Sequence, residues 1–254
     1  MTLPNWPPSV MGRSMTLTDY DGYVIRTVNY RESDQMITFL TPNGLISFLA
    51  HGINKPTSKN AASCRLLSHS KVSLSEGKVG FLSLSEGICL APIPEKEDLT
   101  TMAGLTFLAE LSAQVLQVED SSKAYPWLEA AVEAIRAGFD PLTACLIYFA
   151  RVLQISGFGL NVDECVYCGK KKDIVGITYQ DGGFICRHCL SDSSTEAKPR
   201  ELNIIRYSFR CGLEDFRRVS FTKEECCKLL GKFSDYLNNL TGVKLKSLSI
   251  IQKL

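Results

Sequence analysis

The stretch Cys165-Val166-Tyr167-Cys168-Gly169, followed after a spacer by Cys186-Arg187-His188-Cys189, decides how the second half of this chain folds. Each pair of cysteines encloses two residues, and 17 residues separate Cys168 from Cys186. Two tight turns at this spacing present four thiolates to one tetrahedral ion, which is the layout of a zinc ribbon. Because four cysteines leave no position open for water, the sequence predicts one structural Zn²⁺ and not a catalytic one.

The sequence around the two cysteine pairs supports a ribbon. Residues 174–179 favour a strand, and Asp181-Gly182-Gly183 is a turn signal that returns the chain toward the second pair. Gly169 permits the sharp turn of the first knuckle. His188 is an alternative ligand, although its position next to a cysteine ligand strains simultaneous coordination. For Lys170-Lys171-Lys172, contact with phosphate and a solvated loop both remain open.

The remaining cysteines show no paired spacing. Ten cysteines in 254 residues, with no export signal, favour metal binding and reduced thiols over a secreted disulfide scaffold. No apolar run reaches the roughly 18 residues that a membrane span requires, so we expect a cytoplasmic protein with no membrane contact. Six cysteines are expected to be ordinary thiols without a ligand role: Cys64, Cys89, Cys145, Cys211, Cys226 and Cys227.

The upstream segment 15–92 has the alternation of strands. One strand is expected to place Val24, Val28 and Tyr30 on a shared face, and Pro42-Asn43-Gly44 is a hairpin turn. About five short strands in so short a segment favour a small closed barrel. An OB-fold is the leading candidate, and an SH3-like barrel is the alternative.

Beyond the barrel the apolar period becomes helical. Apolar residues recur at helical spacing over 105–118, Pro126 is suited to opening a second helix, and Asp140-Pro141 is a cap and first turn for a third. Thr222 and Glu225 form a capping box before the last long helix. The predicted fold class is α+β and multidomain. Its parts are a flexible leader (1–14), an OB-fold domain (15–92), a helical domain in two parts (93–160 and 200–254) and an inserted zinc ribbon (161–199).

No pattern typical of an active site is present in the sequence. The chain has three histidines, none at a metalloprotease spacing, and it has no phosphate-binding glycine loop and no serine nucleophile elbow. We therefore expect a protein that is not an enzyme.

The net charge of +1 conceals an uneven distribution. Residues 1–92 carry eight Lys and Arg against six Asp and Glu, residues 93–159 carry four against nine, and residues 201–254 carry ten against six. Positive ends permit an anionic partner. Cations on the predicted barrel, together with aromatics such as Tyr23 and Tyr30, are suited to binding a nucleic-acid strand. The cations would contact the phosphates, and the bases would stack on the rings. The candidate nucleic-acid-binding residues are Arg26, Arg31, Lys55, Lys59, Arg65 and Lys71.

This order of barrel, bundle and ribbon resembles the RecO family of bacterial recombination mediators over residues 15–254. The most specific stretch is 151–169, where a helix ends in a glycine turn and the chain runs through Asp163 into the first knuckle. Residues 181–189 resemble the family's second knuckle, and Leu245-Lys246-Ser247-Leu248 is similar to its closing segment.

The resemblance implies a protein that binds single- and double-stranded DNA, anneals complementary strands and performs no covalent chemistry. It also implies work with RecR to load RecA onto DNA covered by single-stranded-DNA-binding protein, in the cytoplasm and at the nucleoid. In the family the barrel is an OB-fold that contacts DNA, and the helical region receives the acidic C-terminal tail of the single-strand binder.

Two features differ from the family's pattern. Gly52 is followed by Ile53-Asn54, so only Lys55 and Lys59 remain in a loop that is usually richer in cations. Fewer phosphate contacts predict weaker DNA binding with a shallower dependence on salt. The acidic middle segment is poorly suited to an acidic tail, so we expect the tail at basic residues near the C-terminus. These candidates are Arg206, Arg210, Arg217 and Arg218.

Two other functions stay open at this point. A zinc-ribbon RNA-binding or transcription-associated module would share the barrel and the knuckles, but it would not anneal strands. A metalloenzyme would require a water-bearing zinc site, which four cysteine ligands do not provide.

Overall fold

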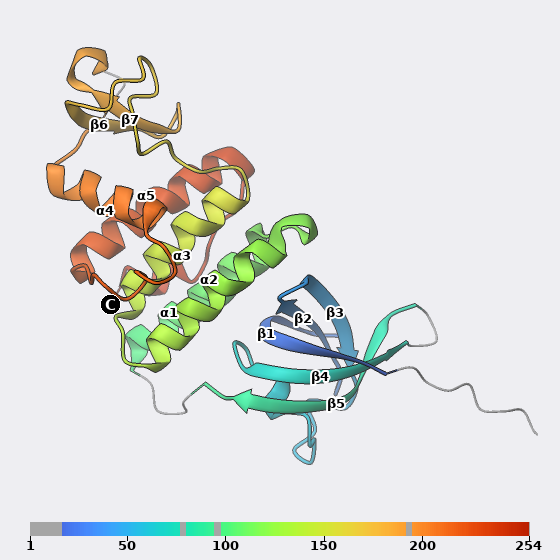
Figure 1. Ribbon diagram of the computed structural model, residues 1–254. Helices are drawn as coiled ribbons and strands as arrows, with labels where there is room; N and C mark the ends of the chain where they lie inside the picture. The colour runs from blue at the N-terminus through green and yellow to red at the C-terminus, as the bar shows by residue number, and fades with distance from the viewer. Residues whose placement is uncertain (1–16, 77–79, 94–97, 192–194, 254) are drawn as a thin grey trace, which may run out of the picture.

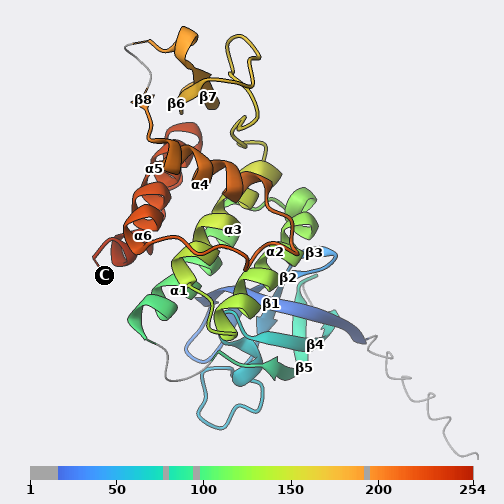
Figure 2. The ribbon, with the colours of Figure 1, turned by 60° about the vertical axis from the view of Figure 1, so that its left-hand side comes forward.

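The structure is a computed structural model that describes residues 17–76, 80–93, 98–191 and 195–253 (Figure 1). The predicted leader, residues 1–14, lies outside the described residues. A strand-rich N-terminal part is followed by helices, and a small three-stranded sheet is inserted between them. In both views the barrel and the inserted sheet lie at opposite ends of the helical part (Figures 1 and 2).

The N-terminal strands close into a barrel. They are β1 (Leu17–Asn29), β2 (Gln35–Thr41), β3 (Gly44–Ala50), β4 (His69–Glu76) and β5 (Leu82–Ala91), and their order is β1-β2-β3-β5-β4. Every neighbouring pair is antiparallel except β3 with β5, which is parallel. The short helix η1 (Ala62–Cys64) lies between β3 and β4 in the chain. Phe39 and Phe48 meet edge to face at 6.0 Å in the interior, which Val24, Val72 and Leu74 also fill.

A β-bulge in β1 changes which side chains face the interior. The pairing of β1 with β2 shifts between Val24 and Arg26. Val24 is fully buried, whereas Val28 is 44% exposed and Tyr30 is 55% exposed. The prediction that these three residues share a face was wrong, because one extra residue in a strand inverts the alternation that follows it.

The helical part surrounds one buried helix. The helices are α1 (Leu99–Val115), α2 (Val118–Arg136), α3 (Pro141–Ile155), α4 (Pro199–Arg210), α5 (Lys223–Thr241) and α6 (Leu248–Ile251). α3 is buried almost throughout and packs against α1, α2, α4 and α5. The predicted capping box is confirmed, since Thr222 and Glu225 each bond the other's backbone N–H. Asp140 caps α3 ahead of Pro141, also as predicted. No helix in the described ranges is long and apolar enough to cross a membrane.

Pro126 lies inside α2 and does not begin it, so that prediction was wrong. α1 ends at Val115, and α2 already begins at Val118. A proline inside a helix removes one backbone hydrogen bond. The flanking residues Tyr125 and Leu128 are buried in the core, and this burial offsets the lost bond.

Part of the barrel packs into the apolar core of the helices, which is separate from the barrel's own interior. Tyr23 of β1 is fully buried between the barrel and the helices, and its ring stacks on His69 at 4.7 Å and lies 6.0 Å from Tyr125 of α2. Its hydroxyl donates to Glu133 at 3.2 Å, and Arg136 donates to the carbonyl of Ala91 at 2.6 Å. The prediction of Tyr23 as an exposed ring for base stacking was therefore wrong. Its ring joins the barrel to α2.

The inserted sheet carries the second cysteine pair at the end of one of its strands. It consists of β6 (Ile174–Thr178), β7 (Gly183–Cys186) and β8 (Thr195–Glu196) in the order β7-β6-β8, with the short helix η2 (Arg187–Cys189) after β7. The ring of Tyr179 lies 5.9 Å from that of Tyr236 on α5, so the sheet packs on the helical part.

Candidate metal centre and nucleic-acid surfaces

The four predicted cysteine ligands come together. The Sγ atoms of Cys165, Cys168, Cys186 and Cys189 all lie within 4.8 Å of one another. Cys168 and Cys186 approach to 3.6 Å between sulfurs. Zinc–sulfur bonds of about 2.3 Å would place tetrahedral sulfurs about 3.8 Å apart, so the spacing and the donor set fit a metal held by four thiolates.

The surroundings of the sulfurs favour a bound cation. Burial opposes ionisation of Cys165, but hydrogen bonds from the backbone N–H groups of Cys186, Tyr167 and Cys168 lower its pKa to about 6. Hydrogen bonding to Cys168 and burial raise the pKa of Cys189 to about 12. Four adjacent thiols cannot all ionise without a compensating charge, and a divalent cation supplies that charge.

Gly183 lets the first knuckle lie directly against β7. A Cβ at this position would meet the carbonyl oxygen of Asn161 at 2.5 Å and Cγ1 of Val166 at 2.7 Å. Three backbone bonds join the two segments: Asn161 N–H to Gly182 at 2.8 Å, Phe184 N–H to Asn161 at 2.9 Å, and Val166 N–H to Phe184 at 2.9 Å. This contact sets the distance between the two cysteine pairs.

His188 and the lysine run do not join the sulfur cluster. His188 is exposed and is absent from the group of potential metal ligands. Lys170, Lys171 and Lys172 are exposed in the segment that leaves the first knuckle.

Arg206 and Arg210, predicted to bind a partner, connect α4 to the ribbon. Arg206 donates from Nε to the carbonyl of Val162 at 2.9 Å, and its guanidinium lies 5.1 Å from the ring centre of Phe184. Arg210 forms an ion pair with Asp163. Sequence reasoning missed this role, because the partners are more than 40 positions away in the chain.

Arg217 and Arg218 belong to the connection between α4 and α5, and neither forms an ion pair with a ribbon residue that the structure describes. Both are exposed, and Arg218 forms an ion pair with Asp215 at 3.1 Å. Phe216 beside them is buried against the rings of Trp127 and Phe139. The structure thus divides the four predicted partner-binding arginines into two sets.

The predicted cations of the barrel lie on several elements. Arg26 lines a hollow between the barrel and α1, Arg65 lines a second hollow, and Thr27 and Leu66 border both. Arg31 lies 5.4 Å over the exposed ring of Tyr30. In contrast, Lys71 lies on β4 and pairs with Asp19 at 3.1 Å.

The loop that carries Lys55 and Lys59 is fixed to the end of the β1–β2 hairpin. Asp34 accepts a hydrogen bond from the N–H of Gly52 at 2.8 Å and contacts Nδ1 of His51 at 3.0 Å. These bonds lower the pKa of the Asp34 carboxyl below its usual value, and the bond from Gly52 has the largest effect. Both lysines remain exposed on the anchored loop.

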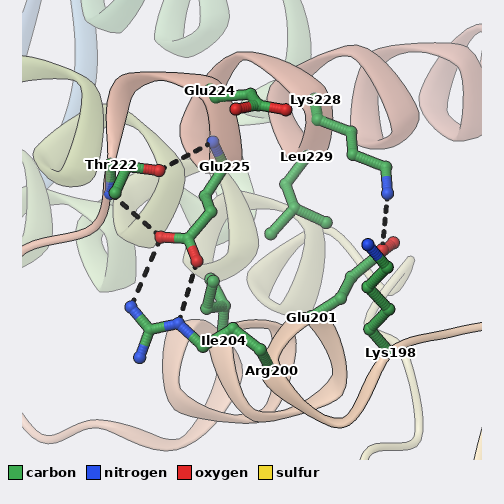
Figure 3. Close-up of a pocket in the computed structure, with 9 residues that line it drawn as sticks. All are labelled: Lys198, Arg200, Glu201, Ile204, Thr222, Glu224, Glu225, Lys228 and Leu229. Atoms are coloured by element: carbon green, nitrogen blue, oxygen red, sulfur yellow. Dashed lines mark hydrogen bonds and ion pairs between the residues drawn. The ribbon is translucent and has the colours of Figure 1, made fainter.

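A groove between α4 and α5 is lined by charged side chains, four of which form ion pairs with an oppositely charged residue (Figure 3). Arg200 donates to both carboxylate oxygens of Glu225, and the pKa of that carboxyl is lowered to about 2, chiefly by Arg200. Glu201 is almost buried and accepts from Lys228 at 2.7 Å and Lys232 at 2.6 Å. These pairs hold the two helices together and leave little net charge for a ligand.

A closed barrel is followed along the chain by a helical part, into which the four-cysteine cluster is inserted. The family model described as Recombination protein O N terminal matches residues 15–92, and the one described as Recombination protein O C terminal matches residues 96–249. The chain therefore belongs to the RecO family of recombination and DNA repair proteins, as its resemblance predicted.

Curated relatives agree with this assignment over nearly the full length. "DNA repair protein RecO" of Bacillus cytotoxicus is 26% identical over 239 residues, which cover 92% of this chain and 96% of the relative. The protein of that name from Bacillus mycoides is also 26% identical, and the one from Bacillus anthracis is 25% identical, at the same coverage. Among solved structures, asparaginyl-tRNA synthetase from Pyrococcus horikoshii aligns at 10% identity with a TM-score of 0.26, over 49% of this chain and 33% of that one. That similarity is too weak to carry an argument.

Proposed function

We propose that this protein is a recombination mediator that binds single- and double-stranded DNA and anneals complementary strands at the nucleoid. With RecR it promotes loading of RecA onto DNA coated by single-stranded-DNA-binding protein, and it performs no covalent chemistry itself. The observation that carries the proposal is family membership, with the two family models matched in order over residues 15–92 and 96–249. Exposed cations on the barrel support contact with DNA.

The barrel is proposed to be an OB-fold. Its strand order and the parallel contact of β3 with β5 support this assignment over an SH3-like barrel. OB-folds bind oligonucleotides on the face of strands 2 and 3 and on the loop between strands 1 and 2. Tyr30 and Arg31 lie in that loop here, and Arg26 pairs with Thr38 of β2. We therefore assign DNA contact first to Arg26, Tyr30 and Arg31. Lys55, Lys59 and Arg65 extend this surface, and Lys71 contributes less because Asp19 neutralises it.

The metal is proposed to be one structural Zn²⁺ held by Cys165, Cys168, Cys186 and Cys189. Bound zinc would supply the positive charge that keeps four thiolates together, and it would fix the two knuckles against each other. The chain's own residues set this geometry through Gly183 and the N–H groups directed at Cys165.

The acidic tail of the single-strand binder is proposed to bind at Arg217 and Arg218. Arg206 and Arg210 are occupied with the ribbon, whereas Arg217 is exposed and has no ion pair with a residue in the described ranges. Replacing Arg217 and Arg218 together with alanine should weaken binding of a fluorescent tail peptide. The control is Lys244→Ala with Lys246→Ala, which removes two exposed charges elsewhere. Equal peptide affinity of the arginine variant and the parent would remove this site.

Complex formation with RecR tests the mediator function. The purified protein and cognate RecR should elute together in size-exclusion chromatography at low salt. Separate elution at equal loading would argue against a mediator that works with RecR.

A further inference from the structure

Four cations belong to the ribbon, whose sheet lies at the end of the helical part away from the barrel (Figures 1 and 2). Lys170, Lys171 and Lys172 follow the first knuckle, and Arg187 lies inside the second. The sulfur cluster brings the two knuckles together. The N–H of Arg187 also donates to the carbonyl of Asp173 at 2.9 Å, so the lysine segment and Arg187, together called the tip, lie side by side.

The charges of this group are free to act on a ligand. All four side chains are exposed, and none forms an ion pair with a residue in the part of the chain that the structure describes. Asp173 is the acidic residue of the same segment, and four thiolates around one Zn²⁺ would carry a net charge of −2 beside it, so the four cations leave only a small excess of positive charge there. This differs from the groove between α4 and α5, where Arg200 and Lys228 are neutralised by glutamates.

We propose that Lys170, Lys171, Lys172 and Arg187 form a second DNA-binding surface, which holds a strand through its phosphates while the barrel holds another. This inference rests on the proposed DNA-binding function and extends it. Because the two surfaces lie at opposite ends of the helical part, one molecule engages two strands without their competing for the same cations.

The chemistry of the tip favours a phosphate backbone over an acidic peptide. Lysine is a compact point charge that binds phosphate without a defined pocket, and a nucleic-acid strand presents a regular row of such charges. The hollow beside Lys171 is also lined by Arg210, which pairs with Asp163, and by the carboxylate of Glu164. Glu164 would repel an acidic side chain that entered this hollow, whereas a nucleic-acid strand along the exposed lysines stays outside it.

The test compares two variants of equal charge. Lys170→Gln, Lys171→Gln and Lys172→Gln remove the tip lysines, and Lys244→Gln, Lys246→Gln and Lys253→Gln remove three exposed lysines near the C-terminus. Two non-complementary single strands, one with a donor and one with an acceptor dye, are mixed with each protein. The parent and the C-terminal variant should bring the two dyes together. The tip variant should show an energy-transfer efficiency at least fivefold lower than the parent, and it should still bind one strand through the barrel.

Salt dependence gives a second readout. The logarithm of the binding constant for the strand held at the tip falls linearly with the logarithm of the salt concentration. Loss of up to three phosphate contacts should make this slope shallower by about 2. Arg187→Gln, from the other knuckle, should shift both readouts in the same direction, and the zinc content of each variant should equal that of the parent. Unchanged energy transfer and slope in the tip variant would overturn the second surface alone, provided that the parent binds DNA. Tip lysines that bind an acidic peptide and not DNA would also overturn it. A parent that binds no DNA would contradict the proposed function itself.

Discussion

Replacement of Gly183 by alanine should weaken zinc binding without touching a metal ligand. The new Cβ would lie 2.5 Å from the carbonyl oxygen of Asn161 and 2.7 Å from Val166. The first contact is with backbone, so the segment that carries Cys165 must move away from β7. Overpacking of this kind costs about 1–3 kcal/mol. The weakened bonds between Asn161, Phe184 and Val166 add about 1 kcal/mol.

A total of about 2–4 kcal/mol corresponds to a zinc dissociation constant raised about 30-fold to several hundred-fold, if release of the metal relieves the clash. Competition with a chromophoric chelator measures this ratio. Gly231→Ala on α5 is the matched control, because its Cβ would meet only the end of the Gln252 side chain at 3.3 Å. This control should leave zinc affinity unchanged. A Gly183→Ala protein that holds zinc within threefold of the parent would refute the role of this contact.

Three further predictions concern other parts of the molecule. Tyr30→Ala should weaken single-strand binding by about 1–3 kcal/mol, which is the contribution of one stacked base. Tyr23→Phe should lower the melting temperature and leave the DNA affinity unchanged. Fluorescence anisotropy measures the affinity, and thermal unfolding measures the melting temperature. Glu225→Gln should cost about 1 kcal/mol of unfolding free energy at neutral pH after allowance for solvent screening, with Glu224→Gln as control. Since the pKa of Glu225 is lowered to about 2, this stabilisation is present above the unfolded value of about 4.3 and is lost as the pH falls toward 2, so denaturant unfolding should show the two proteins converging on acidification. Cys189→Ser should abolish stoichiometric zinc binding and destabilise the ribbon, and a variant that melts like the parent would contradict a structural metal.

The cysteine cluster could be predicted from the sequence because its spacing is local. Each pair sits on a single turn, so chain geometry alone places two sulfurs together, and the intervening hairpin returns the second pair. The caps at Asp140 and Thr222 were predictable for the same reason, since each bond spans three residues.

Features that depend on distant contacts could not be predicted. The bulge of β1 leaves no mark in the apolar pattern, although it moves Val28 and Tyr30 to the outer surface. The aromatic ring of Tyr23 is of the kind that stacks on bases, but α2 covers it. Arg206 and Arg210 looked available for an acidic partner, and only the fold shows that Val162 and Asp163 engage them.

The proposed function requires that this protein anneal DNA strands that are covered by a single-strand binder. The most direct measurement follows the pairing of complementary dye-labelled oligonucleotides, each saturated with the cognate binder, with and without this protein. Pairing should become faster with the protein, and replacing Arg26, Arg31 and Lys55 with glutamine should remove most of the acceleration. Pairing at the same rate with and without the protein, under conditions in which it binds the strands, would contradict the claim.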